Sequence, residues 1–259
     1  MKSLHSKLRE CSLCEYKLYE GFYKNAGGMV RPSTKEELRN EIEIRLDRGQ
    51  YNLNDIDTSK ITNMGGLFAR FNQNRNLSKI DISGWDTSSV VDMSYMFADC
   101  YYFNSDLSRW DVSNVRDMNC MFFSCADFNC DLSKWNTRNV QNMRSMFCDC
   151  QNFVSDLSKW DTRNVSDMSY MFSNCYEFNS DLSKWDVHNV RRMAGMFNGC
   201  KKFNSNLSKW DVSSVFNMES MFYGCTSFNS DLSKWDVSNV EYMNSMFYGC
   251  KNFNCDLSK

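Results

Sequence analysis

The residue types best suited to chemistry in this sequence are its sulfur-containing side chains. The chain of 259 residues has 13 cysteines and 17 methionines but only 2 histidines. Methionine pairs such as Met118 and Met121 are soft ligands of the kind that bind copper(I), yet their helical spacing favours core packing. Cys11 and Cys14 form half of a zinc or redox motif, and no second C-x-x-C pair completes it. We therefore predict no metal site and no cofactor.

Aspartates form two columns, each with a spacing of 25 residues. The first contains Asp86, Asp111, Asp161, Asp186, Asp211 and Asp236, and the second contains Asp106, Asp131, Asp156, Asp181, Asp231 and Asp256. Stacked carboxylates can bind Ca²⁺. Two residues before the first column lies a basic column of Arg109, Lys134, Lys159, Lys184, Lys209 and Lys234. Since residues i and i+2 share a strand face, we interpret the columns as mutually neutralising, with Ca²⁺ binding as the alternative.

Catalysis has little support in the sequence. The histidines, His5 and His188, leave few places for a histidine-based nucleophile relay, and neither G-x-x-x-x-G-K nor G-x-G-x-x-G occurs. We expect a protein that is not an enzyme and has no catalytic residue. The net charge is −2, and no apolar run reaches the roughly 18 residues that cross a bilayer. We therefore expect no nucleic-acid partner and no membrane insertion.

The tryptophans show that the chain is a repeat. They recur every 25 residues, at Trp85, Trp110, Trp135, Trp160, Trp185, Trp210 and Trp235, and a weaker copy begins at Ile56. A fixed period of roughly 20–50 residues indicates a stacked architecture, because so short a unit cannot bury its own apolar face. We predict a solenoid of about eight repeats over residues 51–259.

Each repeat contains two apolar patterns. Leu107, Trp110 and Val112 follow the strand pattern of leucine-rich repeats, and Met118 and Met121 begin a series that steps like one face of a short helix. A column that suits a helix N-cap lies between them: Ser89, Asn114, Asn139, Asn164, Asn189, Ser214 and Asn239. The sequence thus predicts a leucine-rich-repeat-like right-handed coil. A parallel β-sheet would form one side, and short α or 3-10 helices the other.

Half of the cysteines also follow the period. Cys100, Cys125, Cys150, Cys175, Cys200, Cys225 and Cys250 occupy one repeat position. Equivalent residues of successive coils cannot all pair with one another, so we predict a column of free thiols that belongs with the tryptophans in the core. Free thiols and the absence of a signal peptide favour a cytoplasmic location. The cysteines outside the column are interpreted as incidental: Cys120, Cys130, Cys148 and Cys255.

The two ends of the chain differ. Residues 1–50 lack the repeat and are predicted to cap the first coil, with a helix at about residues 34–48. Thr34, the acids that follow it and Gly49 are the start and stop signals of this helix. No capping pattern follows the last repeat, so we expect an open C-terminal coil that a partner or a second copy of the chain covers.

The unit FNSDLSKWDVSNVxxMxxMFxxC resembles the BspA-like leucine-rich-repeat surface proteins, most closely their Mycoplasma-lipoprotein-type branch. The W-D-V-S-N-V and M-F-x-x-C signatures carry this likeness over residues 51–259. The resemblance implies a repeat scaffold, often at a cell surface, that serves adhesion or partner binding. It implies no catalytic residues. Because the chain lacks a lipoprotein signal, a cell-surface location is the alternative to a cytoplasmic one.

Differences between repeats indicate where a partner would bind. The columns of Ser108, Arg109, Asp111 and Ser113 barely change, whereas the predicted helical side and the following turn vary and carry aromatic residues. Exposed aromatic residues are typical interface anchors. This criterion gives ten candidate partner-binding residues: Tyr95, Tyr101, Tyr102, Phe123, Tyr170, Tyr176, Phe216, Tyr223, Tyr242 and Tyr248.

We therefore predict a non-enzymatic scaffold for protein–protein interaction. Two alternatives remain open. One is a self-assembling structural element that joins through the open C-terminal coil. The other is a surface adhesin that binds Ca²⁺ or glycans through the uniform strand face.

Overall fold

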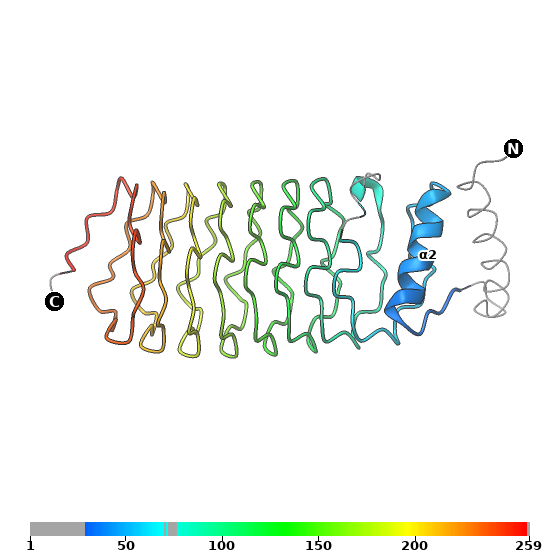
Figure 1. Ribbon diagram of the computed structural model, residues 1–259, viewed down its shortest axis with the longest axis horizontal. Coiled ribbons are helices and arrows are strands. Elements are labelled where there is room, and N and C mark those ends of the chain that lie inside the picture. Colours follow the sequence, from blue (N-terminus) through cyan, green and yellow to red (C-terminus); the bar gives the residue numbers. More distant parts are fainter. Residues whose placement is uncertain (1–28, 70, 72–76, 258–259) are drawn as a thin grey trace, which may run out of the picture.

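The computed structural model describes residues 29–69, 71 and 77–257 of the chain. Coils of 25 residues stack along the long axis of the molecule, and helix α2 (Lys35–Asp47) lies at the N-terminal end of the stack (Figure 1). In the described part of the chain, the 3-10 helix η2 (Leu77–Lys79) is the other helix. The predicted pair Cys11 and Cys14, together with His5, lies outside the described residues.

Helix α2 covers the first coil. It begins after Thr34, whose hydroxyl accepts a hydrogen bond from the N–H of Glu37 at 3.1 Å, as an N-cap does. Leu38 and Ile42 are fully buried against the coil. Beside this apolar stripe, Arg39 donates hydrogen bonds to carbonyl groups of the first coil at 3.0 and 3.1 Å. The apolar stripe and the arginine together fix the helix on the end of the stack.

The regular elements expected within each coil are not found. The described residues contain no β-strand longer than a single bridge, and the coils from Trp85 onward contain no helix. The predicted parallel β-sheet and short α or 3-10 helices are therefore incorrect for these residues. Isolated parallel bridges instead join successive coils at one column, Asn63, Asp92, Asp117, Asn142, Asp167, Arg192, Asn217 and Tyr242. This column lies at the start of the predicted helix and not in the predicted strand.

The segment after each bridge alternates between two hydrogen-bonding patterns. The N–H groups of Cys120 and Phe122 donate to carbonyls of the next coil at 2.8 and 2.9 Å. The N–H of Phe123 donates instead to the carbonyl of Cys120 in its own coil, which closes a turn. Cys120 and Ser124 adopt left-handed φ angles of 54° and 58°, which occur in neither an α-helix nor a strand. The helix-like spacing of the apolar residues therefore arises from consecutive turns.

The Leu-x-x-Trp-x-Val segment joins the coils through side chains. The indole Nε1 of Trp160 donates to the carbonyl of Leu132 in the preceding coil at 3.0 Å. The hydroxyl of Ser155 accepts the N–H of Leu132 at 2.9 Å, and the Thr137 hydroxyl donates to the carbonyl of Asp161 at 3.0 Å. From the coil of Trp85 onward, side chains span the gap between the described coils here and no backbone ladder forms. The first coil is joined to the second by a single bridge between Asn52 and Asp81.

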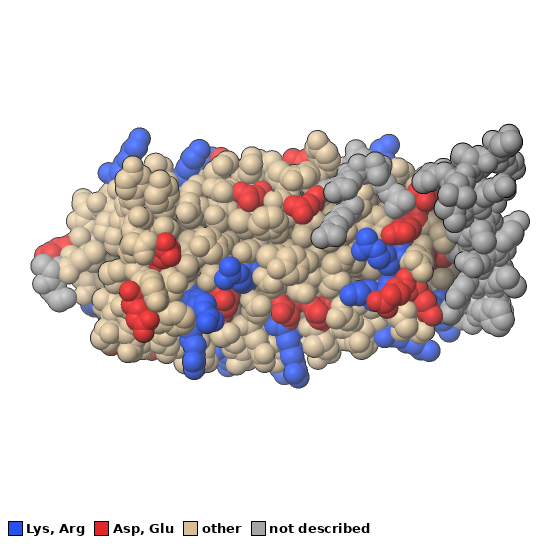
Figure 2. Space-filling view, in the orientation of Figure 1, with Lys and Arg blue, Asp and Glu red and all other residues tan. Residues whose placement is uncertain are grey.

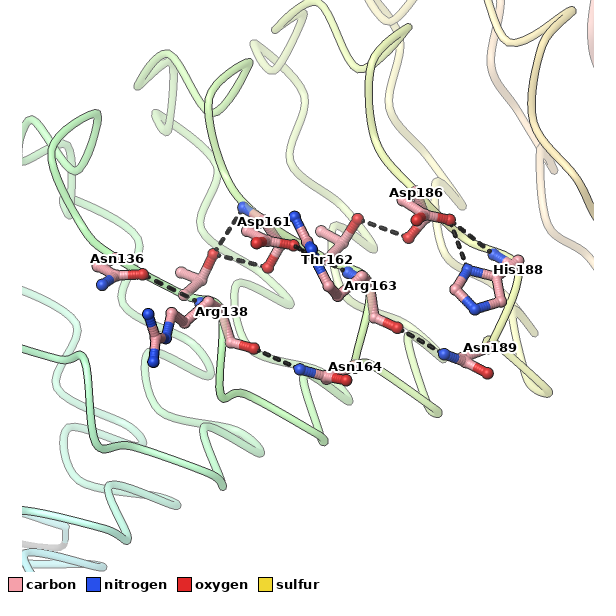
Figure 3. A network of polar contacts seen from close by, with 10 residues as sticks. Asn136, Arg138, Asp161, Thr162, Arg163, Asn164, Asp186, His188 and Asn189 are labelled. Atoms are coloured by element: carbon pink, nitrogen blue, oxygen red, sulfur yellow. Dashed lines mark hydrogen bonds and ion pairs between the residues drawn. The ribbon is translucent and has the colours of Figure 1, made fainter.

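The asparagines that were predicted to cap helices connect successive coils instead. The side-chain amide of Asn164 donates to the carbonyl of Arg138 at 2.7 Å, and that of Asn189 donates to the carbonyl of Arg163 at 2.7 Å. Each asparagine thus reaches back to the preceding coil (Figure 3). Because no helix follows, there are no free N–H groups of a first helical turn for it to cap.

Stacked aromatic columns fill the centre of the molecule. The rings of Trp135 and Trp160 lie 6.2 Å apart and nearly parallel, and those of Trp160 and Trp185 lie 6.5 Å apart. Phe147 and Phe172 belong to a second column, with ring centroids 5.7 Å apart. The predicted core tryptophans from Trp85 to Trp210 expose only 3–4% of their surface.

The last described coil is less well covered than the others. Trp235, Phe247 and Cys250 are partly buried, although their equivalents in earlier coils are buried. Val237 and Met243 are exposed. Each coil is covered by the one that follows, which explains the difference.

Replacing Trp160 by alanine is expected to lower the free energy of unfolding by about 3–5 kcal/mol. The change empties a buried site between two stacked rings and leaves the carbonyl of Leu132 without its indole donor. The matched variant Trp160→Phe keeps most of the ring area, so it is expected to lose less. Urea unfolding followed by circular dichroism compares the two. A loss below about 1 kcal/mol for the alanine variant would contradict the buried stack.

Candidate interaction surface

One side of the molecule is held together mainly by backbone hydrogen bonds, to which a few side chains add links, as Asn174 does by donating to Asp149 at 2.8 Å. We call it the ladder face and define it as residues 92–99, 117–124, 142–149, 167–174, 192–199, 217–224 and 242–249. Alternate N–H groups in these segments donate to the next coil wherever a further described coil follows. Backbone groups are the same in every residue, so the outward side chains of the ladder face can change without separating the coils. This explains why the sequence varies here.

Most of the predicted partner-binding residues lie on the ladder face. They are Tyr95, Phe123, Tyr170, Tyr223, Tyr242 and Tyr248. Phe216 directly precedes a ladder segment, and Tyr101, Tyr102 and Tyr176 directly follow one. The structure therefore places the ten candidates on one side of the coils and its margins. It does not bring them into one continuous cluster.

Several of these tyrosines are well exposed. Tyr248 exposes 66% of its surface and Tyr242 exposes 50%. The rings of Tyr223 and Tyr248 stack on each other with centroids 4.9 Å apart, which orders both side chains before any partner binds. Stacked and ordered tyrosines lose little conformational entropy on binding, which suits an interface.

Other candidate rings are already covered by neighbours. The ring of Tyr170 lies so close over Gly195 that a Cβ atom there would be 2.5 Å from it, and the guanidinium of Arg144 lies 5.7 Å from its centroid. Lys201 lies 4.3 Å from the ring centroid of Tyr176, as a cation–π pair. These rings are less available to a partner than Tyr242 and Tyr248.

Charged residues do not form one large field on the side shown in Figure 2, where they occur in small groups among uncharged side chains. The aspartates of the two columns accept hydrogen bonds within their own turns. Asp156 accepts the N–H of Ser158 at 2.9 Å, and this N–H lowers the pKa of Asp156 more than Lys159 does. The turn, more than the basic column, therefore stabilises the ionised carboxylate. Among the described residues, no three His, Cys, Asp or Glu side chains are grouped so as to hold a metal ion.

The cysteine column is a third set of links between coils. The thiol of Cys175 donates to the carbonyl of Phe147 at 2.9 Å, and the thiol of Cys200 donates to that of Phe172 at 2.9 Å. The described cysteines are free, and those of this column from Cys100 to Cys225 are buried. Burial raises the pKa of the Cys100 thiol to about 12. Such thiols are poor nucleophiles and poor metal ligands at neutral pH.

Two cysteines outside the column replace a serine. Ser155 accepts the N–H of Leu132, and Cys130 accepts the N–H of Leu107 in the same way at 3.1 Å. Cys255 occupies this position in the last described coil. These cysteines have a structural role that their variability between repeats conceals. Buried Cys148 has a different setting, in which burial and then Asp149 raise its pKa to about 12.

The repeating coils, the stacked aromatic columns and the scarcity of regular secondary structure define a solenoid-like repeat protein. The family model described as a Mycoplasma protein of unknown function, DUF285, matches residues 43–158 and again residues 143–259. The chain therefore belongs to the DUF285 family. No curated protein and no solved structure matches the chain. The helices in the described part of the chain are too short or too polar to cross a membrane.

We expect the free energy of unfolding to fall as the pH rises above about 9. An unfolded thiol titrates near its ordinary pKa of 9.0, whereas burial raises the pKa of Cys100 to about 12 and that of Cys175 well above 9.0. Between these values the unfolded chain has lost protons that the folded chain keeps. The stabilisation is therefore complete below pH 9 and is lost as the pH approaches the folded-state values.

Urea unfolding at a series of alkaline pH values tests this prediction. Burial also raises the pKa of Cys200, so Cys200→Ala should reduce the slope of stability against pH by about 1.4 kcal/mol per pH unit. Ser180→Ala removes no titrating group and should leave the slope unchanged. An unchanged slope in the cysteine variant would show that this thiol is not protected.

Proposed function

We propose that the chain is a non-enzymatic scaffold for protein–protein interaction and that its partner binds to the ladder face. The supporting observation is the exposed tyrosines at positions that vary between coils, on a side where backbone hydrogen bonds connect each described coil to the next. A surface of this kind can differ from coil to coil while its support stays constant. It is therefore suited to recognising one particular partner.

The physical setting of the tyrosines supports binding over a purely structural role. Tyr248 makes its ring contact with Tyr223 at the surface, and 66% of its own surface remains exposed. Other coils place alanine, cysteine, serine or asparagine at this position, at Ala98, Cys148, Ser173 and Asn198. The stack thus does not need a tyrosine here. An amphipathic ring held on a rigid support is a typical interface anchor.

The resemblance to surface adhesion proteins suggests one of two classes of partner. BspA-like members serve adhesion, so a protein on another cell's surface would be one class of partner. A cytoplasmic partner is the other class, which the buried free thiols favour. The ladder face has the same role in both cases.

The proposal is tested with a partner captured by a photocrosslinking residue at position 248 and then purified. The double variant Tyr223→Asn/Tyr248→Ser should weaken binding at least tenfold, roughly the effect of losing one interface anchor. Both replacements already stand at the equivalent positions Asn198 and Ser173, so the fold should be kept. Isothermal titration calorimetry measures the affinities.

The matched control is Tyr101→Gln/Tyr102→Asn, which removes two exposed tyrosines beside the ladder face. Its replacements stand at the equivalent positions Gln151 and Asn152. We expect this control to bind within about twofold of the unchanged protein, as most residues outside an anchor cluster do. Equal affinities for both double variants and the unchanged chain would overturn the assignment of the ladder face.

A further inference from the structure

The third residue after each tryptophan is a serine in most coils and a basic residue in three consecutive ones. Serines stand at Ser88, Ser113, Ser213 and Ser238, and at the equivalent Ser59 of the first coil. The basic residues are Arg138, Arg163 and His188. They lie one above another along the stack (Figure 3). The column of Ser113 is therefore uniform except for an interruption of three consecutive coils.

The basic residues keep the turn that the serines make. The N–H of Ser113 donates to Asp111 at 2.9 Å, and the N–H of Arg163 donates to Asp161 at 3.3 Å. In the coil of Arg138, the N–H donates to the side-chain oxygen of Asn136 at 3.4 Å. The backbone hydrogen bond is thus present with either residue type. The long cationic side chains are therefore not required for the backbone hydrogen bond that closes the turn.

Arg163 and His188 each contact the aspartate of their own turn, at 2.8 and 2.7 Å, but neutralising the aspartate column does not account for the whole pattern of cations. The turns that contain Asp111, Asp211 and Asp236 have a serine at the third position and no cation there. Conversely, Arg138 shares its turn with Asn136, so that turn contains no acid to neutralise. Relative to an Asp-x-Ser turn, Asn136 and Arg138 each make the local charge more positive by one. The side chain of Arg138 is exposed.

The geometry fixes the row of cations. Asn164 and Asn189 donate to the carbonyls of Arg138 and Arg163 at 2.7 Å each, which ties the three turns together. Arg163 Nε lies 2.8 Å from an oxygen of Asp161, so the two terminal nitrogens of the guanidinium are left for a ligand. The rings of Trp135, Trp160 and Trp185, which directly precede these turns, lie 6.2 and 6.5 Å apart between centroids.

A second row of positive charge runs beside the first. Each of the three coils carries a lysine directly before its tryptophan, at Lys134, Lys159 and Lys184. Side chains at the turn positions 136–139, 161–164 and 186–189 include no phenylalanine, tyrosine or tryptophan, and the ring of His188 contacts Asp186 through Nδ1 at 2.7 Å. The edge thus offers charge and hydrogen-bond donors, with His188 as the one ring of these turns on which a nucleobase could stack. Val187, the apolar residue of these turns, is buried, so the edge has no apolar anchor for a lipid bilayer.

We propose that Arg138, Arg163 and His188 form a binding site for an acidic peptide segment. Guanidinium groups bind carboxylates through paired, charge-assisted hydrogen bonds. Acidic side chains three or four residues apart on a helix lie about 5–6 Å apart, which is close to the spacing of the coils. A helical segment with glutamates at this spacing can therefore face all three basic residues at once. The site lies outside the ladder face and is independent of the function proposed above.

The test uses a fluorescein-labelled helical peptide with glutamates at every third or fourth position, and the same peptide with glutamine at those positions. Fluorescence anisotropy at low and at physiological ionic strength measures binding to the whole chain. The triple variant Arg138→Ser/Arg163→Ser/His188→Ser restores the residue of the other coils. It should bind the glutamate peptide about tenfold more weakly or worse. The unchanged chain should bind the glutamine peptide no more tightly than the triple variant binds the glutamate peptide.

The matched control is Lys201→Thr/Lys202→Ser, which removes two positive charges about half a coil away from His188. Its replacements stand at the equivalent positions Thr226 and Ser227. It should bind the peptide within about twofold of the unchanged chain. Should the triple variant melt early, the single variant Arg138→Glu at an exposed position provides the same comparison and should also abolish binding.

Three outcomes would overturn the proposal. The first is that the unchanged chain does not bind the glutamate peptide. The second is equal binding by the triple variant and the unchanged chain, or an equal loss in the lysine control. The third is that labelled single-stranded DNA or vesicles with anionic lipid bind more tightly than the peptide and lose this binding in the triple variant. That result would assign the site to a different class of partner.

Discussion

The structure depends on hydrogen bonds in which a side chain of one coil donates to a backbone carbonyl of the preceding coil. Trp160 donates to the carbonyl of Leu132, Asn164 donates to that of Arg138, and Cys175 donates to that of Phe147. The carbonyls of Leu132 and Phe147 also accept the N–H of Trp135 and of Cys150 in their own turns, so the side-chain bond adds a link to the neighbouring coil, worth about 0.5–1.5 kcal/mol. The donors also fill the core or seal its edge. A residue that packs and bonds at once cannot be exchanged freely, which explains why tryptophan and cysteine recur without exception after the first coil.

The two sides of the coil use different groups for the hydrogen bonds that join successive coils. On the ladder face, backbone N–H groups supply most of the bonds between coils, and side-chain links such as that of Asn174 to Asp149 occur in some coils and not in others. On the opposite stretch, the serine, tryptophan, threonine and asparagine side chains supply them. Variation therefore concentrates on the ladder face. A repeat protein built in this way can evolve a specific surface on one side while the other side keeps the stack in register.

The sequence predicts the period and the stacked columns, because both follow from the spacing of large apolar residues. It fails on the local conformation of each coil. The pattern from Met118 to Cys125 fits a helix, yet the chain forms turns with left-handed residues at 120 and 124. One signal for this was present. From Asp99 onward, the position of Ser124 is occupied by aspartate, serine, asparagine or glycine in each coil, and aspartate, asparagine and glycine are the residues that tolerate a left-handed φ best.

The candidate surface, like the fold, could be predicted only in part from the sequence. Comparison of the repeats identifies the tyrosines that vary, because variation reflects freedom from structural duty. It does not show which rings are covered. The overlap of Tyr170 with Gly195, and the position of Arg144 over its ring, depend on how neighbouring coils align in space. Spacing along the chain contains no information about that alignment.

Some polar side chains of the turn bond within their own coil and others bond between coils. This difference explains how the basic residues Arg138, Arg163 and His188 arose on a side whose sequence otherwise changes little from coil to coil. The hydroxyl of Ser88 bonds to Asp86 at 2.6 Å, and that of Ser213 bonds to Asp211 at 2.6 Å, so this serine acts within its own turn. The residue after this serine position is an asparagine in most coils, and Asn114 and Asn239 act between coils. Replacing the serine by arginine or histidine therefore leaves every link between coils in place. Among the polar residues of the turn, the serine is thus the position where a new binding property costs the least stability.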